Sequence, residues 1–309
     1  MSLISVAELA AALDDPDLRI ADVRWSLAAP AAGRVAYASA HLPGAVFVDL
    51  DTVLTAAVGP GRHPLPDPAT FATALGALGI GRGHRIVAYD DAGGTVAARL
   101  WWMLDALGHA TVAVLDGGIE AWQSAGQPVT AEVPTFAAAE PIPTSGAGSA
   151  WPRTIDRVTL AARLGGVTIL DARAQERYRG DVEPIDRIPG HIPTARSLPT
   201  TALLAPSGRF LAADALAARF AAAGVGAARL GGTPRAGEAA TGAVPVRQVV
   251  VSCGSGVNAS QLALGMRAAG LPDPLLYPGS YSDWTQSGMP IATGDEPGAA
   301  PRSSGSSRR

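Results

Sequence analysis

The stretch Gln248-Val249-Val250-Val251-Ser252-Cys253-Gly254-Ser255-Gly256 decides the fold of this chain. Its run of valines is typical of a buried strand, and residues Ala259 to Ala269 have the pattern of a helix. A second short apolar run, Pro274 to Leu276, follows the helix. Strand, helix and strand at this spacing predict parallel strands joined by a helical crossover.

The first half of the chain shows the same order. A strand is predicted for Arg85 to Tyr89, a helix for Thr95 to Leu107, and a further strand for Thr111 to Leu115. Each half is therefore expected to be a small α/β unit of its own.

Three motifs of the first half recur in the second, so the chain contains an internal repeat. Their offsets are 171 − 22 = 149, 191 − 41 = 150 and 284 − 122 = 162 residues. The pairs are Asp22-Val23-Arg24 with Asp171-Ala172-Arg173, His41-Leu42-Pro43-Gly44-Ala45 with His191-Ile192-Pro193-Thr194-Ala195, and the segment ending at Trp122 with the one ending at Trp284. The larger third offset predicts an insertion, for which the Gly-, Pro- and Thr-rich segment 231–245 is the candidate.

These patterns predict an α/β protein of two tandem domains, each a small parallel sheet with helices on both faces. We expect a first domain over residues 1–131, an Ala-, Pro- and Gly-rich linker over 132–151, a second domain over 152–297 and a disordered tail over 298–309.

Composition excludes several classes of function. The net charge is −3 and no basic stripe is present, which argues against nucleic-acid binding. No apolar run approaches the ~18 residues that span a bilayer, and the first residues do not resemble a signal peptide. A single cysteine suits a reducing compartment, so a soluble cytoplasmic protein is expected. One cysteine without clustered His, Asp or Glu predicts no metal site.

Cys253 is the candidate for chemistry because it ends a buried strand and precedes a glycine-rich loop and a helix. Ligands of open α/β sheets bind at this edge. Backbone N–H groups of the loop, together with the helix dipole, stabilise an anion such as a thiolate or a persulfide. The alternative is a small apolar core residue, which is the usual role of a buried cysteine.

Cys253-Gly254-Ser255-Gly256-Val257 resembles the active-site loop of the two-domain sulfurtransferases of the rhodanese family, and in particular their 3-mercaptopyruvate form. The thiosulfate form carries Arg and Lys after the cysteine, where this chain has Gly254 and Ser255. The resemblance extends from about Asp22 to Gly294. Further motifs carry it, namely Tyr37 with 41–45, Arg99-Leu100-Trp101-Trp102, and 277–284.

The resemblance implies a catalytic second domain and a silent first domain, in which Asp90 stands where the cysteine would be. It implies that Arg177 binds the donor, since a guanidinium fork suits a carboxylate or a sulfonate. The alternative for Arg177 is a surface arginine paired with Glu176 or Asp181. Arg187 is a weaker candidate for a second donor-binding arginine.

His41 matches a first-domain histidine that the resemblance pairs with Ser255 in a proton relay. No acid lies between residues 26 and 40 to complete such a relay. The alternative for His41 is a structural hydrogen bond that closes a turn, a role that its repeat partner His191 would share. His63, His84 and His109 lie outside these motifs.

Loop residues Gly254, Gly256, Val257 and Asn258 are expected to bind the substrate. Asn258 replaces the family's usual threonine, but its amide can still donate a hydrogen bond to a persulfide. No cofactor is expected besides the covalent cysteine persulfide.

The expected function is transfer of sulfur from 3-mercaptopyruvate or thiosulfate, through a persulfide on Cys253, to cyanide, a small thiol or a thioredoxin-like protein. A thiosulfate-preferring rhodanese is the first alternative, and a non-catalytic sulfur carrier is another. A cysteine-dependent phosphatase would need an arginine six positions after the cysteine, where this chain has Ala259.

Overall fold

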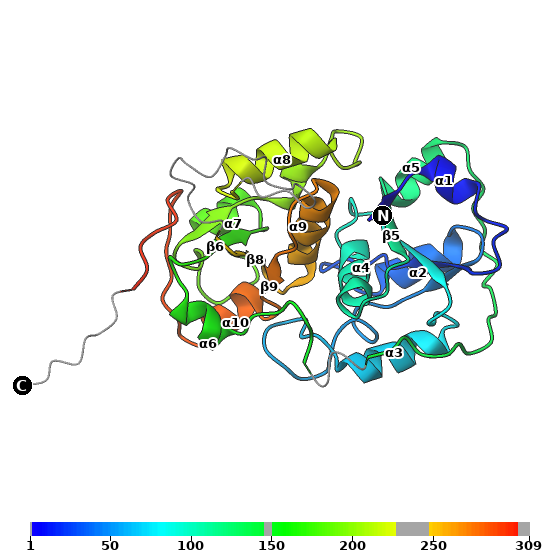
Figure 1. The fold of residues 1–309 in the computed structure, drawn as a ribbon, viewed down its shortest axis with the longest axis horizontal. Coiled ribbons are helices and arrows are strands. Elements are labelled where there is room, and N and C mark those ends of the chain that lie inside the picture. The colour runs from blue at the N-terminus through cyan, green and yellow to red at the C-terminus, as the bar shows by residue number, and fades with distance from the viewer. Residues whose placement is uncertain (1, 145–149, 227–246, 302–309) are drawn as a thin grey trace, which may run out of the picture.

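The computed structural model describes residues 2–144, 150–226 and 247–301. Within these residues the strands form two parallel sheets, ordered β1-β5-β4-β2-β3 and β7-β6-β8-β9 (Figure 1). The strands are β1 Leu3–Ile4, β2 Leu18–Asp22, β3 Ala45–Phe47, β4 Arg85–Tyr89, β5 Val112–Leu115, β6 Thr168–Asp171, β7 Ala195–Ser197, β8 Val249–Ser252 and β9 Leu275–Leu276. The predicted fold of two α/β domains is confirmed.

Helices connect these strands. Those of the first domain are α1 Val6–Ala10, α2 Ala32–Ser39, α3 Pro68–Ala77, α4 Ala97–Ala106 and α5 Gly118–Ser124. Those of the second are α6 Arg157–Ala162, α7 Gln175–Arg179, the 3₁₀ turn Thr200–Leu203, α8 Ala213–Ala222, α9 Val257–Ala268 and α10 Ser280–Gln286. No helix in this described part of the chain is long and apolar enough to cross a membrane.

The two sheets have equivalent registers, as an internal repeat requires. In the first, Asp22 of β2 pairs with Tyr89 of β4, and in the second Asp171 of β6 pairs with Ser252 of β8. The residue after β4 and the residue after β8 therefore occupy matching places at the carboxyl edges of their sheets. That edge is where an open parallel sheet binds its ligands.

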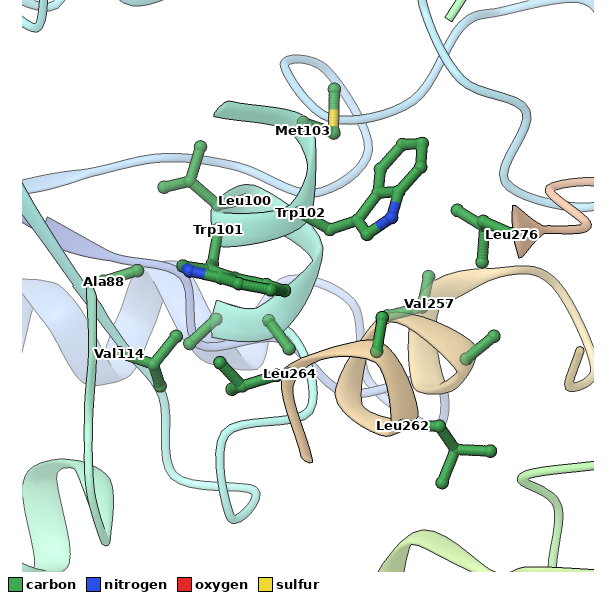
Figure 2. Packing of buried hydrophobic residues seen from close by; sticks show 14 of the residues in the cluster. Ala88, Leu100, Trp101, Trp102, Met103, Val114, Val257, Leu262, Leu264 and Leu276 are labelled. Atoms are coloured by element: carbon green, nitrogen blue, oxygen red, sulfur yellow. The ribbon is translucent and has the colours of Figure 1, made fainter. Parts of the chain in front are cut away.

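Both faces of each sheet are covered because successive side chains of a strand point to opposite sides. One face of the first sheet packs on α1 and α5, and one face of the second packs on α6 and α10. The other two faces belong to a single apolar cluster that runs through α3, α4, α8 and α9. Figure 2 shows its centre, where Trp101 and Trp102 of α4 lie opposite Val257 and Leu264 of α9. The two domains therefore share a continuous core.

Several bounds differ from the sequence prediction by a few residues. Helix α9 begins at Val257, two residues before the expected Ala259, because Gly256 is left-handed and the chain turns into the helix directly after it. The proposed insertion 231–245 lies outside the described residues, as do residues 145–149 of the linker and 302–309 of the tail.

Candidate active site

Cys253 follows β8 directly and lies at the carboxyl edge of the second sheet. Its Sγ accepts hydrogen bonds from the N–H groups of Ser255, at 3.4 Å, and of Gly256, at 3.0 Å. Gly256 has a φ of +82°, and a Cβ there would lie 2.5 Å from the carbonyl oxygen of Pro278. Only glycine suits this position. The loop thus curls around the sulfur with two donors turned inward, an arrangement that stabilises a sulfur anion.

A pocket of about 300 Å³ opens above this loop, and both domains wall it. The first domain contributes Trp25, Arg62 and His63, and the second contributes Arg177 and Asn258. The cysteine lies beneath, only 1% exposed, so a donor must enter the pocket to reach it. A wall of guanidinium, aromatic and amide groups suits a small anionic molecule with a short carbon skeleton.

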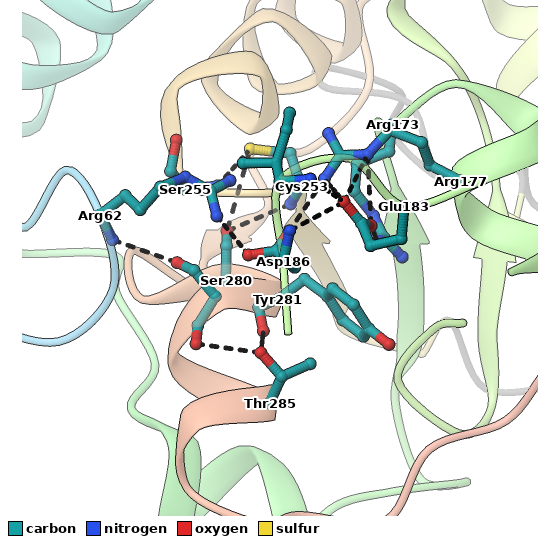
Figure 3. A network of polar contacts seen from close by, with 12 residues as sticks. Arg62, Arg173, Arg177, Glu183, Asp186, Cys253, Ser255, Ser280, Tyr281 and Thr285 are labelled. Carbon is teal, nitrogen blue, oxygen red and sulfur yellow. Dashed lines mark hydrogen bonds and ion pairs between the residues drawn. The ribbon is translucent and has the colours of Figure 1, made fainter. Parts of the chain in front are cut away.

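Alternating charges link the arginines of this pocket (Figure 3). Asp186 pairs with both Arg62 and Arg177, and its contact with Arg177 measures 2.9 Å. Glu183 pairs with Arg177 at 2.8 Å and with Arg173 at 3.2 Å. Burial would raise the pKa of Glu183, but hydrogen bonds from the Asp186 N–H and from Arg177 outweigh it and keep that pKa below its usual value. Glu183 is therefore ionised, and the arginines are held in place by fixed acids.

The second arginine at the pocket comes from the first domain. Arg187, the candidate from sequence, is exposed and does not line the pocket, whereas Asp186 beside it is turned inward. A Cβ on Gly254 would lie 2.7 Å from Nη2 of Arg62 and 3.7 Å from Nη1 of Arg177. Both guanidinium groups thus converge over Gly254, and a side chain at that position would displace the guanidinium of Arg62.

His63, rather than His41, faces the loop serine. Its Nδ1 lies 2.8 Å from Oγ of Ser255, and its Nε2 lies 4.0 Å from Oδ1 of Asp51. Burial and the neighbouring Arg99 lower the pKa of His63 to about 4, so the ring is neutral at neutral pH. Trp25 donates to Asp51 at 2.9 Å and holds its carboxylate in place. An acid, a histidine and a hydroxyl therefore stand in line beside the cysteine.

The prediction that His41 takes part in the relay is corrected by these contacts. Its two ring nitrogens face backbone carbonyls, Nδ1 that of Tyr37 at 2.7 Å and Nε2 that of Glu132 at 3.0 Å, and the ring stacks on Tyr37. His191 likewise contacts the carbonyl of Tyr178 through Nδ1, at 2.8 Å, and stacks on that tyrosine, while its Nε2 has no partner within the described residues. The structural alternative holds for both histidines. Neither the relay histidine nor its acid was found from sequence, because both lie in the segment between β3 and α3.

The remaining loop residues divide between core and pocket. Val257 is 3% exposed and packs in the shared core, although it also borders the pocket. Asn258 lines the pocket, and within the described residues its amide has no hydrogen-bond partner, so it is free to bind a ligand. No group of three His, Cys, Asp or Glu residues that could hold a metal ion occurs in the described ranges.

Asp90 occupies the equivalent place in the first domain, directly after β4. Its carboxylate accepts four backbone N–H groups, two on each oxygen, at 2.8–2.9 Å. The donors are Ala92, Gly94, Val96 and Ala97. The first domain therefore has the same kind of loop, filled by a side chain that cannot carry sulfur.

Comparison with known proteins agrees with this geometry. The family model for the rhodanese-like domain matches residues 5–125 and again 156–287. A Pseudomonas aeruginosa protein named "Probable 3-mercaptopyruvate sulfurtransferase" is 42% identical over 95% of this chain and 98% of its own length. "Thiosulfate/3-mercaptopyruvate sulfurtransferase 2" of Arabidopsis thaliana is 30% identical over 94% of this chain and 86% of its own length.

Solved structures show the same similarity. The crystal structure of SseA from Escherichia coli has a TM-score of 0.73 at 30% identity, covering 91% of this chain and all of that one. The 3-mercaptopyruvate sulfurtransferase of Leishmania major gives 0.75 at 30% identity, over 93% of this chain and 74% of that one.

Two repeats of one domain, with a cysteine cradled in only the second, define a protein of the tandem rhodanese type. The chain belongs to the family of two-domain rhodanese-type sulfurtransferases. It is accordingly an enzyme, and its reaction class is sulfur transfer.

Proposed function

We propose that this enzyme takes sulfur preferentially from 3-mercaptopyruvate and holds it as a persulfide on Cys253. The thiolate of Cys253 attacks the donor's sulfur, and the donor's carbon–sulfur bond breaks. The electron pair of that bond passes to the enolate of pyruvate, and the donor's thiol proton ends on the enolate carbon. The N–H groups of Ser255 and Gly256, which already face Sγ, stabilise the sulfur anion.

The observation that carries this proposal is the 2.8 Å contact between Nδ1 of His63 and Oγ of Ser255. Cleavage of a carbon–sulfur bond requires a proton to move from sulfur to carbon, whereas sulfur transfer from thiosulfate requires none. The neutral imidazole of His63, which Asp51 orients, can exchange a proton with the hydroxyl of Ser255. Ser255 is then the group that carries the proton to the enolate carbon. A proton relay beside the cysteine therefore favours mercaptopyruvate over thiosulfate.

Donor binding falls to Arg177 and Arg62. Their guanidinium groups converge over Gly254 and line the pocket from opposite domains, which places a donor carboxylate beside the cysteine. Asp186 and Glu183 neutralise much of their charge, so a monoanionic carboxylate is suited better than the dianion thiosulfate.

Discharge of the persulfide completes the cycle. Cyanide, a small thiol or a thioredoxin-like protein attacks the outer sulfur and regenerates the Cys253 thiolate. No dissociable cofactor enters this scheme, since the cysteine itself carries the sulfur. We place the reaction in the cytoplasm, because a catalytic thiol without a partner cysteine works best in a reducing compartment.

Thiosulfate preference is the second candidate, and the proximity of Arg62 to the loop favours it. The arginine that a thiosulfate enzyme carries next to its cysteine is absent, but Arg62 brings a guanidinium to the same place from the other domain. We do not propose a phosphatase activity, because the position that needs a phosphate-binding arginine holds Ala259, which is buried in α9.

Steady-state turnover of the two donors, with cyanide as acceptor, tests the donor assignment. We expect kcat/KM for mercaptopyruvate to exceed that for thiosulfate at least tenfold, and Cys253→Ser to abolish both activities. A preference for thiosulfate would overturn the donor assignment. Failure of both donors to form a cyanide-labile persulfide would overturn the mechanism.

Substitution of single arginines tests the binding assignment. Arg177→Gln and Arg62→Gln should each raise KM for mercaptopyruvate about tenfold or more, the usual loss for a hydrogen bond to a charged group. Arg187→Gln is the matched control, since Arg187 is exposed outside the pocket and should leave KM unchanged. A raised KM in Arg187→Gln alone would show that the arginine expected from sequence binds the donor after all.

A further inference from the structure

Arg99 of α4 is fully buried, with 0% of its surface exposed, and it lies where the two domains meet. Among the residues that the structure describes, its guanidinium donates to backbone carbonyls alone, those of His63 at 3.0 Å, Leu54 at 3.3 Å and Gly256 at 3.4 Å. Its Nε has no partner within the described residues. A buried cation in such a neutral setting is costly, because carbonyl dipoles replace water only in part.

The other arginines of the site are balanced by buried carboxylates. Arg62, Arg173 and Arg177 are each paired with at least one of Asp171, Glu183 and Asp186, so three cations meet three anions. Arg99 forms no ion pair with a carboxylate anywhere in the described residues. Asp51, the remaining carboxylate of the site, is about half exposed to solvent and contacts His63 and Trp25 rather than Arg99. Within the described residues, Arg99 is therefore a buried positive charge that no carboxylate pairs.

The missing negative charge has a natural location. Arg99 donates to the carbonyl of Gly256, and the N–H of the same glycine donates to Sγ of Cys253 at 3.0 Å. Burial lowers the pKa of Arg99 to about 10, with a thiolate at Cys253 acting in the opposite direction, so Arg99 stays charged at neutral pH. A thiolate or a persulfide at Cys253 would restore the balance.

Arg99 also fixes the relay. The carbonyl of His63 accepts from Nη2 of Arg99, while the ring of His63 contacts Ser255. One guanidinium thus joins the segment that carries His63 to the loop that carries Cys253, although the two belong to different domains.

We propose that Arg99 is the buried counter-charge of the sulfur anion on Cys253 and the positioning residue that holds His63 against the catalytic loop. This inference rests on the proposed use of Cys253 as a sulfur carrier. It assigns to the silent first domain the positive charge that stabilises a buried sulfur anion at this site.

Alkylation of Cys253 by iodoacetamide, followed as a function of pH, tests the electrostatic role. The reagent is neutral and needs no sulfur donor, so its result is independent of donor turnover. Arg99→Met should lower the alkylation rate at pH 7 about tenfold and move the pH profile upward, since an opposite charge nearby favours the thiolate. Arg99→Lys retains the charge and should recover most of that rate. It should remain slow with mercaptopyruvate, because an ammonium cannot hold both carbonyls.

Gln261 supplies the matched control for a lost contact between domains. It is buried in α9 and bonds the carbonyl of Gly93 at 2.6 Å and the hydroxyl of Thr95 at 2.8 Å, with no charge involved. Gln261→Met should leave the pH profile of alkylation in place. An unchanged profile in folded Arg99→Met, or an equal change in Gln261→Met, would overturn the proposal.

A second comparison avoids changing Arg99 at all. Cys253→Asp and Cys253→Asn differ only in the charge they place in the loop. We expect the Asp variant to have the higher melting temperature at pH 7, because it gives Arg99 a permanent anion. An Asn variant of equal or higher stability would show that no counter-charge is needed, whatever the behaviour of the Arg99 variants.

Discussion

The two repeats differ most instructively at one position, the residue after their matching strands β4 and β8. Asp90 fills the first loop with a carboxylate that accepts four N–H groups, whereas Cys253 in the second loop accepts two through its sulfur. Both loops are therefore built to hold an anion. In the first domain the anion is part of the chain, and in the second the proposed mechanism forms and consumes it on Cys253. The comparison shows that the same kind of loop can hold either a fixed carboxylate or a reactive sulfur.

The largest effect is expected from removing the permanent anion. Burial raises the pKa of Asp90 although four N–H groups act against it, so this carboxyl is costly to bury and is held by its donors. Asp90→Ala leaves those donors unpaired and should lower the free energy of unfolding by about 3–4 kcal/mol. Denaturant unfolding measures this loss. Cys253→Ala, the matched change in the second loop, should cost only about 1 kcal/mol. Equal losses of stability would mean that Asp90 holds its loop together no more strongly than Cys253 does.

The next effect concerns what the silent repeat gives to the active one. His63→Gln and Ser255→Ala should each lower kcat for mercaptopyruvate about 100-fold, the usual contribution of a positioned acid–base group. Thiosulfate turnover should fall less than about threefold, because that donor needs no proton transfer. A parallel loss with both donors would show that His63 only supports the loop.

A smaller effect is expected in the dependence of stability on pH. Burial lowers the pKa of His63 to about 4 in the folded chain, whereas an unfolded histidine titrates near 6.5. Between these values the unfolded state binds more protons, so stability falls as the pH falls from 6.5 toward 4. Unfolding at pH 7 and pH 5 should show about 1 to 2 kcal/mol of this loss in the parent and none of it in His63→Gln. An identical pH dependence in both would contradict the neutral, buried ring.

The smallest effect on activity is expected from the two structural histidines. His41 and His191 each stack on a tyrosine of their own domain and contact its carbonyl through Nδ1. His41→Gln and His191→Gln should each cost about 1 kcal/mol of stability and leave turnover within about twofold. A selective loss of turnover in His41→Gln would restore this residue to the relay.

The local parts of the site were predictable from the sequence, and the parts supplied across the domain boundary were not. Cys253 and its loop could be found because a buried strand, two glycines and a helix follow one another in the chain. His63 contacts Ser255 across 192 residues, and no periodicity marks the segment in which it lies. Arg187 failed as a candidate because spacing within a loop does not determine which side chain turns inward. At that point Asp186 does so, to meet Arg62 and Arg177.

The fold was easier to predict because the same motifs occur in both halves of the sequence. Asp22-Val23-Arg24 and Asp171-Ala172-Arg173 form the same buried ion pair, at 2.6 Å and 2.7 Å, at the ends of the equivalent strands β2 and β6. Helix ends were less predictable, because hydrogen bonds determine them. The carboxylate of Asp90 takes the N–H groups of Val96 and Ala97, and α4 begins at Ala97 rather than at Thr95.

The apolar cluster that runs from α3 and α4 into α8 and α9 has a consequence for how the molecule comes apart. Because the two repeats share one apolar core, neither is expected to stay folded without the other. Heat or denaturant should therefore unfold both in a single cooperative step. Loss of the first repeat would remove His63 and Arg99 and expose Trp101 together with the inner face of α9. Unfolding and inactivation are then one event, and the enzyme leaves no half-folded species that still handles reactive sulfur.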